Sequence, residues 1–185
     1  MLLNYLNPQR LLSITILSSC AIWIIFSRVD ENQFDVHSNS VPFPGFEAPD
    51  FLVSDHNEAS VSLSDYKGQT VLLNFWASWC SPCREEMPAM ERIYQEYKDQ
   101  GFEILALNST HQDSRQKAIV FADELGLSFP ILFDKDGSAS KQYQIQALPS
   151  SFFIDADGVI QDVVFGGPMS EALLRIRVQN LLKGK

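Results

Sequence analysis

The chain has 185 residues, of which 45% are hydrophobic and 20% charged, and its formal net charge is −9. This length and composition fit one ordinary domain with a short extension, and they exclude a disordered chain and a protein with many membrane spans. The acidic charge argues against nucleic acid as a partner. The three cysteines are too few for a scaffold that depends on disulfides.

The N-terminal stretch 11–27 has no charged residue and is mostly apolar, with Arg10 before it and Arg28 after it. As a helix it would rise about 25 Å, slightly less than a hydrocarbon core of roughly 30 Å. A signal anchor that stays in the membrane, with Arg10 inside, is one interpretation. A cleaved signal peptide is another, although no typical cleavage site follows the stretch.

A third interpretation rests on Cys20. The tetrapeptide LSSC at 17–20 resembles a bacterial lipobox, whose cysteine becomes lipidated, although the apolar stretch continues past it. All three interpretations place the rest of the chain outside the cytoplasm, on the periplasmic or extracellular side of a cell membrane. The expected organisation is a signal anchor or signal peptide at 1–27, a polar tether at 28–45 and a globular domain at 46–185.

Apolar runs and helical periodicity alternate through the globular part. Residues 70–77 (TVLLNFWA) form a nearly continuous apolar run, which predicts a central strand buried on both faces. A helix follows from Pro82 to about Lys98, because apolar residues recur at steps of three and four and Gly101 ends the pattern. The other expected elements are strands at 102–109 and 130–134, helices at 114–125 and 138–143, a hairpin at 151–165, and a last helix at 171–182 capped by Ser170, with Ala172, Leu173, Ile176 and Leu181 as its apolar residues.

This order predicts an α/β domain with a central mixed β-sheet and helices on both faces. Upstream, residues 48–51 and 61–68 are expected to form an edge strand and a turn that lead into the core.

The sequence WCSPC at 79–83 places two cysteines between the predicted central strand and the helix after it. The amides and dipole of a helix N-terminus favour negative charge, so the pKa of the Cys80 thiol should be lowered. Pro82 suits the first helical turn, which needs no N–H at that position. Cys83, one turn on, is placed to attack a mixed disulfide formed on Cys80. The pattern therefore predicts a redox-active pair.

Two other interpretations of the pair are weaker. Structural zinc needs four ligands, and the chain has neither a second cysteine pair nor two histidines at ligand spacing, so no metal is expected. A static disulfide would close a very short loop and stabilise the fold little.

The chain resembles the thioredoxin superfamily, and within it the membrane-tethered thiol:disulfide oxidoreductases of the TlpA/ResA/CcmG type. The resemblance covers about 46–182. It is carried by APDF at 48–51, by the segment 63–91 around WCSPC, and by ALPSSFFIDADGVI at 147–160. Together these motifs are far more specific than a cysteine pair alone.

The resemblance implies roles for residues around the pair. Leu148 and Pro149 match the loop in which such proteins carry a cis-proline that faces the cysteines and shapes the substrate groove. Trp79 looks like the exposed indole beside the nucleophile, and with Pro82 it is expected to contact substrate. By contrast, Trp76 is expected in the core.

Two positions distinguish the branch. Thioredoxins carry a buried aspartate six residues before the first cysteine, whereas this chain has Asn74, which cannot titrate. In the ResA-like branch a glutamate three residues after the second cysteine lies near the pair, and here that residue is Glu86. Glu86 is expected to tune the thiols or to relay a proton, with a solvated charge in the first helical turn as the alternative.

The resemblance implies an extracytoplasmic enzyme that reduces disulfides in envelope proteins, for example apocytochrome c, with electrons from a membrane thiol donor. No cofactor is expected beyond the Cys80–Cys83 pair itself. Two alternatives remain open. One is a copper-handling thioredoxin-fold module, although such relatives usually have a wider cysteine spacing and a histidine ligand. The other is a peroxiredoxin-like peroxidase, since APDF also opens that branch.

Overall fold

The computed structural model describes residues 42–184. The expected anchor at 1–27, Cys20 and most of the expected tether lie outside the described residues. Between residues 42 and 184, no helix combines the length and the apolar character needed to cross a membrane. The backbone N–H of Gly45 donates to the carbonyl of Ile160 at 2.8 Å, so the end of the expected tether is tied to the domain.

A seven-stranded mixed sheet forms the centre of the domain, in the order β2-β1-β5-β4-β3-β6-β7. Strand β3 is parallel to β4 and antiparallel to β6, so it lies inside the sheet. The strands are β1 (Leu52–Ser54), β2 (Ser60–Ser62), β3 (Thr70–Trp76), β4 (Phe102–Asn108), β5 (Ile131–Phe133), β6 (Ser150–Ile154) and β7 (Ile160–Phe165). The helices are α2 (Ser81–Tyr97), α3 (Arg115–Leu125), α4 (Ser138–Gln142) and α5 (Glu171–Lys183), with short 3-10 turns η2 (Leu63–Tyr66), η3 (Lys98–Gln100) and η4 (Thr110–Gln112).

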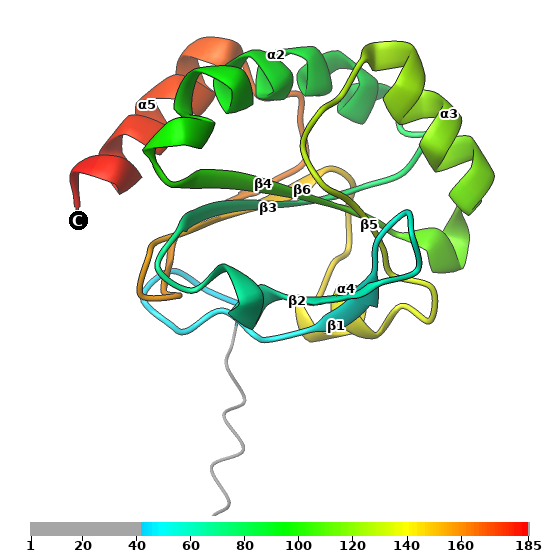
Figure 1. The fold of residues 1–185 in the computed structure, drawn as a ribbon, viewed down its shortest axis with the longest axis horizontal. Coiled ribbons are helices and arrows are strands. Elements are labelled where there is room, and N and C mark those ends of the chain that lie inside the picture. The colour runs from blue at the N-terminus through cyan, green and yellow to red at the C-terminus, as the bar shows by residue number, and fades with distance from the viewer. Residues whose placement is uncertain (1–41, 185) are drawn as a thin grey trace, which may run out of the picture. The chain divides into compact units, whose positions relative to one another are not determined.

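Each face of the sheet carries its own hydrophobic core. The long helices α2, α3 and α5 lie over one face, and the short α4 lies on the other with β1 and β2 nearby (Figure 1). Because side chains alternate along a strand, β3 serves both cores: Leu72 and Trp76 pack under the long helices, whereas Leu73 and Phe75 pack on the α4 side. The same alternation places Asn74 on the face that carries α2.

The predicted mixed sheet, its order of elements and the helices on both faces are confirmed. One difference concerns the upstream strands: residues 48–51 form no strand, β2 lies at the edge of the sheet, and β1 lies between β2 and β5. Pro49 has no N–H for a ladder, and Asp50 instead accepts hydrogen bonds from the backbone of Phe51 and Ser64.

A second difference concerns the last helix. Ser170 caps α5 as predicted, since its side chain accepts from the N–H of Leu173. However, Leu173 and Ile176 are exposed, and the buried face consists of Leu174, Val178 and Leu181. Apolar residues occur around much of this helix, so the sequence alone did not determine which side packs against α2.

Candidate active site

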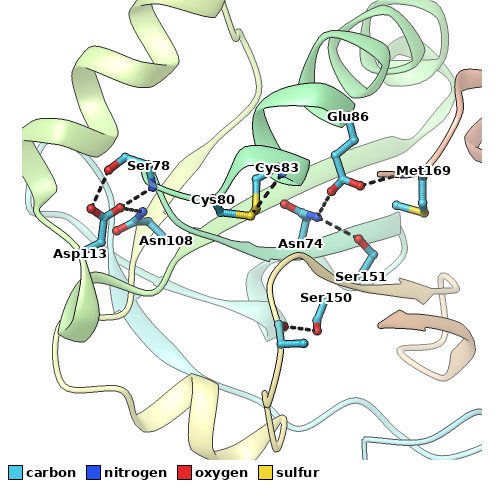
Figure 2. The surroundings of a disulfide bond; sticks show 11 residues. Asn74, Ser78, Cys80, Cys83, Glu86, Asn108, Asp113, Ser150, Ser151 and Met169 are labelled. Carbon is cyan, nitrogen blue, oxygen red and sulfur yellow. Dashed lines mark hydrogen bonds between the residues drawn. A yellow bond between two sulfur atoms is a disulfide. The ribbon is translucent and has the colours of Figure 1, made fainter. Parts of the chain in front are cut away.

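The Cys80–Cys83 pair is a disulfide at the junction of β3 and α2, with an S–S distance of 2.06 Å (Figure 2). Cys80 is the N-cap of α2, and its sulfur accepts a hydrogen bond from the backbone N–H of Cys83 at 3.2 Å. Pro82 lies in the first helical turn, as predicted. Cys80 keeps 4% of its surface exposed and Cys83 none. Cys80 is therefore the cysteine nearer to solvent.

The loop before Cys80 is fastened to the carboxyl end of β4. Asp113 accepts hydrogen bonds from the backbone N–H and the hydroxyl of Ser78, at 2.6 and 2.7 Å, and from the Asn108 amide at 2.8 Å. Burial raises the pKa of Asp113, but these hydrogen bonds and one from the Ser114 N–H outweigh it, so the net pKa is lowered. Asp113 is therefore held as a carboxylate that anchors the loop.

Trp79 lies on this anchored loop. Its side chain is 60% exposed, and its indole N–H donates to the carbonyl of Gln112 at 3.1 Å. Trp76 is completely buried, so the prediction that separated the two indoles is confirmed.

The Leu148–Pro149 peptide bond is cis, which confirms that part of the prediction. Leu148 packs against the hydrophobic cluster that contains both cysteines. The carbonyl of Pro149 accepts from the N–H of Gly166 at 2.8 Å. A Cβ on Gly167 would lie 2.7 Å from the Pro149 ring and 2.9 Å from a carboxylate oxygen of Glu86. Glycine is thus the residue that lets the segment before α5 approach both groups.

Glu86 lies one turn after Cys83 and is only 1% exposed, so it is not the solvated charge considered as the alternative. One carboxylate oxygen accepts from the Asn74 Nδ2 at 3.0 Å, and the other accepts from the backbone N–H of Met169 at 3.0 Å. Burial raises the pKa of Glu86, and these two hydrogen bonds oppose that rise only in part. A buried carboxyl group with a raised pKa, one helical turn from the cysteine pair, can serve as a proton acceptor or donor.

Asn74 joins this group from within β3. Besides donating to Glu86, its Nδ2 donates to the hydroxyl of Ser151 at 2.9 Å, directly across from it in the β3–β6 register. Among the described residues, its Oδ1 is buried without a hydrogen-bond partner. An unpaired buried acceptor of this kind costs about 1–3 kcal/mol.

The structure thus brings together the residues named from the sequence: the two cysteines, Glu86, and the loop of Leu148 and Pro149. The sequence analysis missed Asp113, Ser151, Gly167 and the backbone N–H of Met169. Asp113 was the easiest to find, because the carboxyl ends of parallel strands β3 and β4 meet at one edge of the sheet. Within 42–184, no three histidine, cysteine or acidic side chains gather as a metal site would require.

Residues 44–163 match the family described as AhpC/TSA. The chain belongs to this family. It is 45% identical over 120 residues to the thiol-disulfide oxidoreductase ResA of Bacillus thuringiensis subsp. konkukian, which covers 64% of this chain and 68% of the relative. It is also 45% identical over 123 residues to the thioredoxin-like protein YneN of Bacillus subtilis, over 66% of this chain and 71% of the relative.

Among solved structures, a thiol:disulfide interchange protein of the thioredoxin family from Chlorobium tepidum aligns with a TM-score of 0.67 and 25% identity, covering 74% of this chain and 95% of that one. The fold is therefore thioredoxin-like, and the chain is a thiol–disulfide oxidoreductase with Cys80 and Cys83 as its cysteine pair.

Proposed function

We propose that this thiol–disulfide oxidoreductase works outside the cytoplasm, held at the membrane by its N-terminal segment, and reduces disulfides in envelope proteins. The observation that carries the redox part is the disulfide at the N-terminus of α2, with Cys80 nearer to solvent than Cys83. The apolar stretch 11–27 supports the location. Apocytochrome c with oxidised haem-binding cysteines is one candidate substrate.

The reaction runs as two exchanges. The Cys80 thiolate attacks one sulfur of the substrate disulfide and forms a mixed disulfide with it. The substrate S–S bond breaks, and the other substrate sulfur leaves as a thiolate. Cys83 then gives its proton to the Glu86 carboxylate and attacks the Cys80 sulfur. This step forms the Cys80–Cys83 bond and releases the substrate sulfur that was bound to Cys80. Two electrons pass from the pair to the substrate, and a membrane thiol donor returns them.

The surroundings of the pair suit these steps. The Cys83 N–H and the helix N-terminus stabilise negative charge on Cys80. Trp79, Pro82, Leu148 and Pro149 would contact an extended substrate segment beside Cys80. No cofactor other than the cysteine pair takes part in this scheme.

The reduction potential of the pair tests the direction. The full-length protein carrying Cys20→Ser is equilibrated in detergent with defined thiol–disulfide buffers, and alkylated thiols are counted by mass. A potential near or below about −230 mV, in the range of thioredoxins and glutaredoxins, supports a reductant. A value near about −120 mV would instead make the protein a disulfide donor. A pair that never cycles would overturn the redox role itself.

A further inference from the structure

The orientation of the Asn74 side chain is determined by its neighbours. Its Nδ2 lies 3.0 Å from a Glu86 carboxylate oxygen and 2.9 Å from the Ser151 hydroxyl. A carboxylate oxygen only accepts hydrogen bonds, so the amide nitrogen must face Glu86 and the amide oxygen must face away from it.

That oxygen is aimed at the cysteine pair. Figure 2 shows the Asn74 Oδ1 on the side of the amide that faces the disulfide, whereas the nitrogen faces Glu86 and Ser151. Asn74 has no exposed surface, and within the described chain its Oδ1 is one of the few buried side-chain atoms without a hydrogen-bond partner. A disulfide has no proton to offer, so the oxidised pair cannot satisfy this oxygen.

Reduction changes the supply of donors, because it converts the disulfide into two thiol groups. The Cys80 sulfur caps α2 and accepts the Cys83 N–H, a setting that favours its thiolate. The Cys83 sulfur is completely buried, and burial favours its neutral thiol. The S–H group that appears inside the protein therefore belongs to Cys83.

We propose that the Asn74 Oδ1 accepts a hydrogen bond from the Cys83 thiol in the reduced protein, a bond that the oxidised protein lacks. Asn74 is then a positioning residue. It fixes the position of the neutral Cys83 thiol, and it stabilises the reduced form relative to the oxidised form. The inference rests on the redox activity proposed above, but on neither its direction nor its substrate.

Infrared spectroscopy of the S–H stretch tests the bond directly. In the full-length chain carrying Cys20→Ser and Cys80→Ala, Cys83 is the only thiol. Its band is expected at the lower frequency of a hydrogen-bonded thiol, and Asn74→Ala should move it to the free-thiol position. Ser151→Ala is the matched control, because it removes a neighbour of Asn74 but leaves the Oδ1 in place, and the band should stay. A free-thiol band with Asn74 present, or no movement in the Asn74→Ala variant, would overturn the proposal.

A second measurement needs no change at Asn74 and so avoids a variant that fails to fold. In the full-length Cys20→Ser chain, the 13Cγ resonance of Asn74 should shift between the oxidised and reduced states as its oxygen gains a donor. An Asn74 resonance that is the same in both states would contradict the bond.

The redox equilibrium gives the size of the effect. Asn74→Ala should shift the equilibrium with dithiothreitol toward the disulfide about five-fold, the size of one net hydrogen bond, which corresponds to about 20 mV. To separate this bond from the contact with Glu86, the same change is made in a Glu86→Ala background, where the shift should persist. If it vanishes there, Asn74 acts only through Glu86. If the pair cannot be reduced at all, the proposed function fails instead, independently of this bond.

Discussion

The loop on one side of the disulfide is anchored by the partly buried Asp113 carboxylate, whereas the buried Asn74 amide and Glu86 carboxyl group lie on the other side (Figure 2). On the first side, Asp113 anchors the loop of Ser78 through one backbone and one hydroxyl donor. On the second, Asn74 and the Met169 N–H fix both oxygens of Glu86. Two cysteines three positions apart thus occupy different electrostatic surroundings. The two sulfurs therefore differ in their access to solvent and in the polar groups that lie near them.

Removing either sulfur should have the largest effect on activity. Cys80→Ser should lower reduction of a disulfide substrate by at least about a thousandfold, because the attacking sulfur is gone. Cys83→Ser should be equally inactive in turnover but should accumulate a mixed disulfide on Cys80, seen by mass spectrometry. Both variants are made in the Cys20→Ser chain. Accumulation in the Cys80→Ser variant instead would reverse the two roles.

Glu86→Gln changes only the buried group that includes Asn74 and the Met169 N–H. A positioned proton acceptor contributes about a hundredfold or more, so turnover near neutral pH should fall by about that factor. In the parent, the rate should rise with pH as Glu86 loses its proton, and this limb should lie above its ordinary pKa of 4.5, since burial raises that pKa. The variant should lack the limb. A pH–rate profile that is unchanged in shape would remove Glu86 from the mechanism.

The same variant has a signature in stability. Because folding raises the pKa of Glu86, its contribution to the free energy of unfolding is fully present below about pH 4.5. That contribution declines as pH rises through the pKa of the folded state. Glutamine does not titrate, so the free energy of unfolding of the variant relative to the parent should increase across that window. Urea unfolding at a series of pH values measures it.

Gly167→Ala should strain the contact of the segment before α5 with Pro149 and Glu86. The added Cβ would lie under 3 Å from both the Pro149 ring and the Glu86 carboxylate. Overpacking of this kind costs about 1–3 kcal/mol, and substrate turnover should fall with it. Gly184→Ala is the control, because the contacts of its Cβ are an ordinary 3.7 Å. Equal stability of the two variants in thermal melts would mean that the contact of Gly167 with Pro149 and Glu86 has room for a Cβ.

Asp113→Ala should give the smallest effect, because the Asp113 side chain is only partly buried. The loss of its hydrogen bonds to Ser78 and Asn108 should destabilise the protein by about 1 kcal/mol near neutral pH. Because folding lowers the pKa of Asp113, this contribution is present above the ordinary value of 3.8 and is lost as pH falls through the folded pKa. The difference in free energy of unfolding between parent and variant should therefore become smaller at acidic pH. A constant difference would assign the effect to packing and not to the carboxylate.

Much of this architecture was readable from the sequence, for identifiable reasons. The apolar run at 70–77 indicated a buried strand, and the helical pattern that begins at Pro82 indicated a helix, so the position of the pair between them followed. Glu86 was predicted because the resemblance to the ResA-like branch implies a glutamate three residues after the second cysteine. Local pattern was sufficient wherever the partners were near in sequence.

The remaining features depend on contacts that local pattern does not encode. Met169 acts through its backbone N–H, which every residue except proline has, so its side chain gives no signal. Gly167 matters only because two other segments converge on it. The apolar residues of α5 did not determine its packed side, since Leu173 and Leu174 are both apolar and only the contacts with α2 and β6 select between them.

The partners of Glu86 come from β3 and from the segment before α5, two parts of the chain that meet only when the domain is folded. The reduction potential of the pair is therefore linked to the folding equilibrium by a thermodynamic cycle. The difference in unfolding free energy between the disulfide and dithiol forms must equal the difference between the redox free energies of the folded and the unfolded pair. Calorimetric unfolding of both forms would therefore measure how much folding changes the reduction potential of the pair.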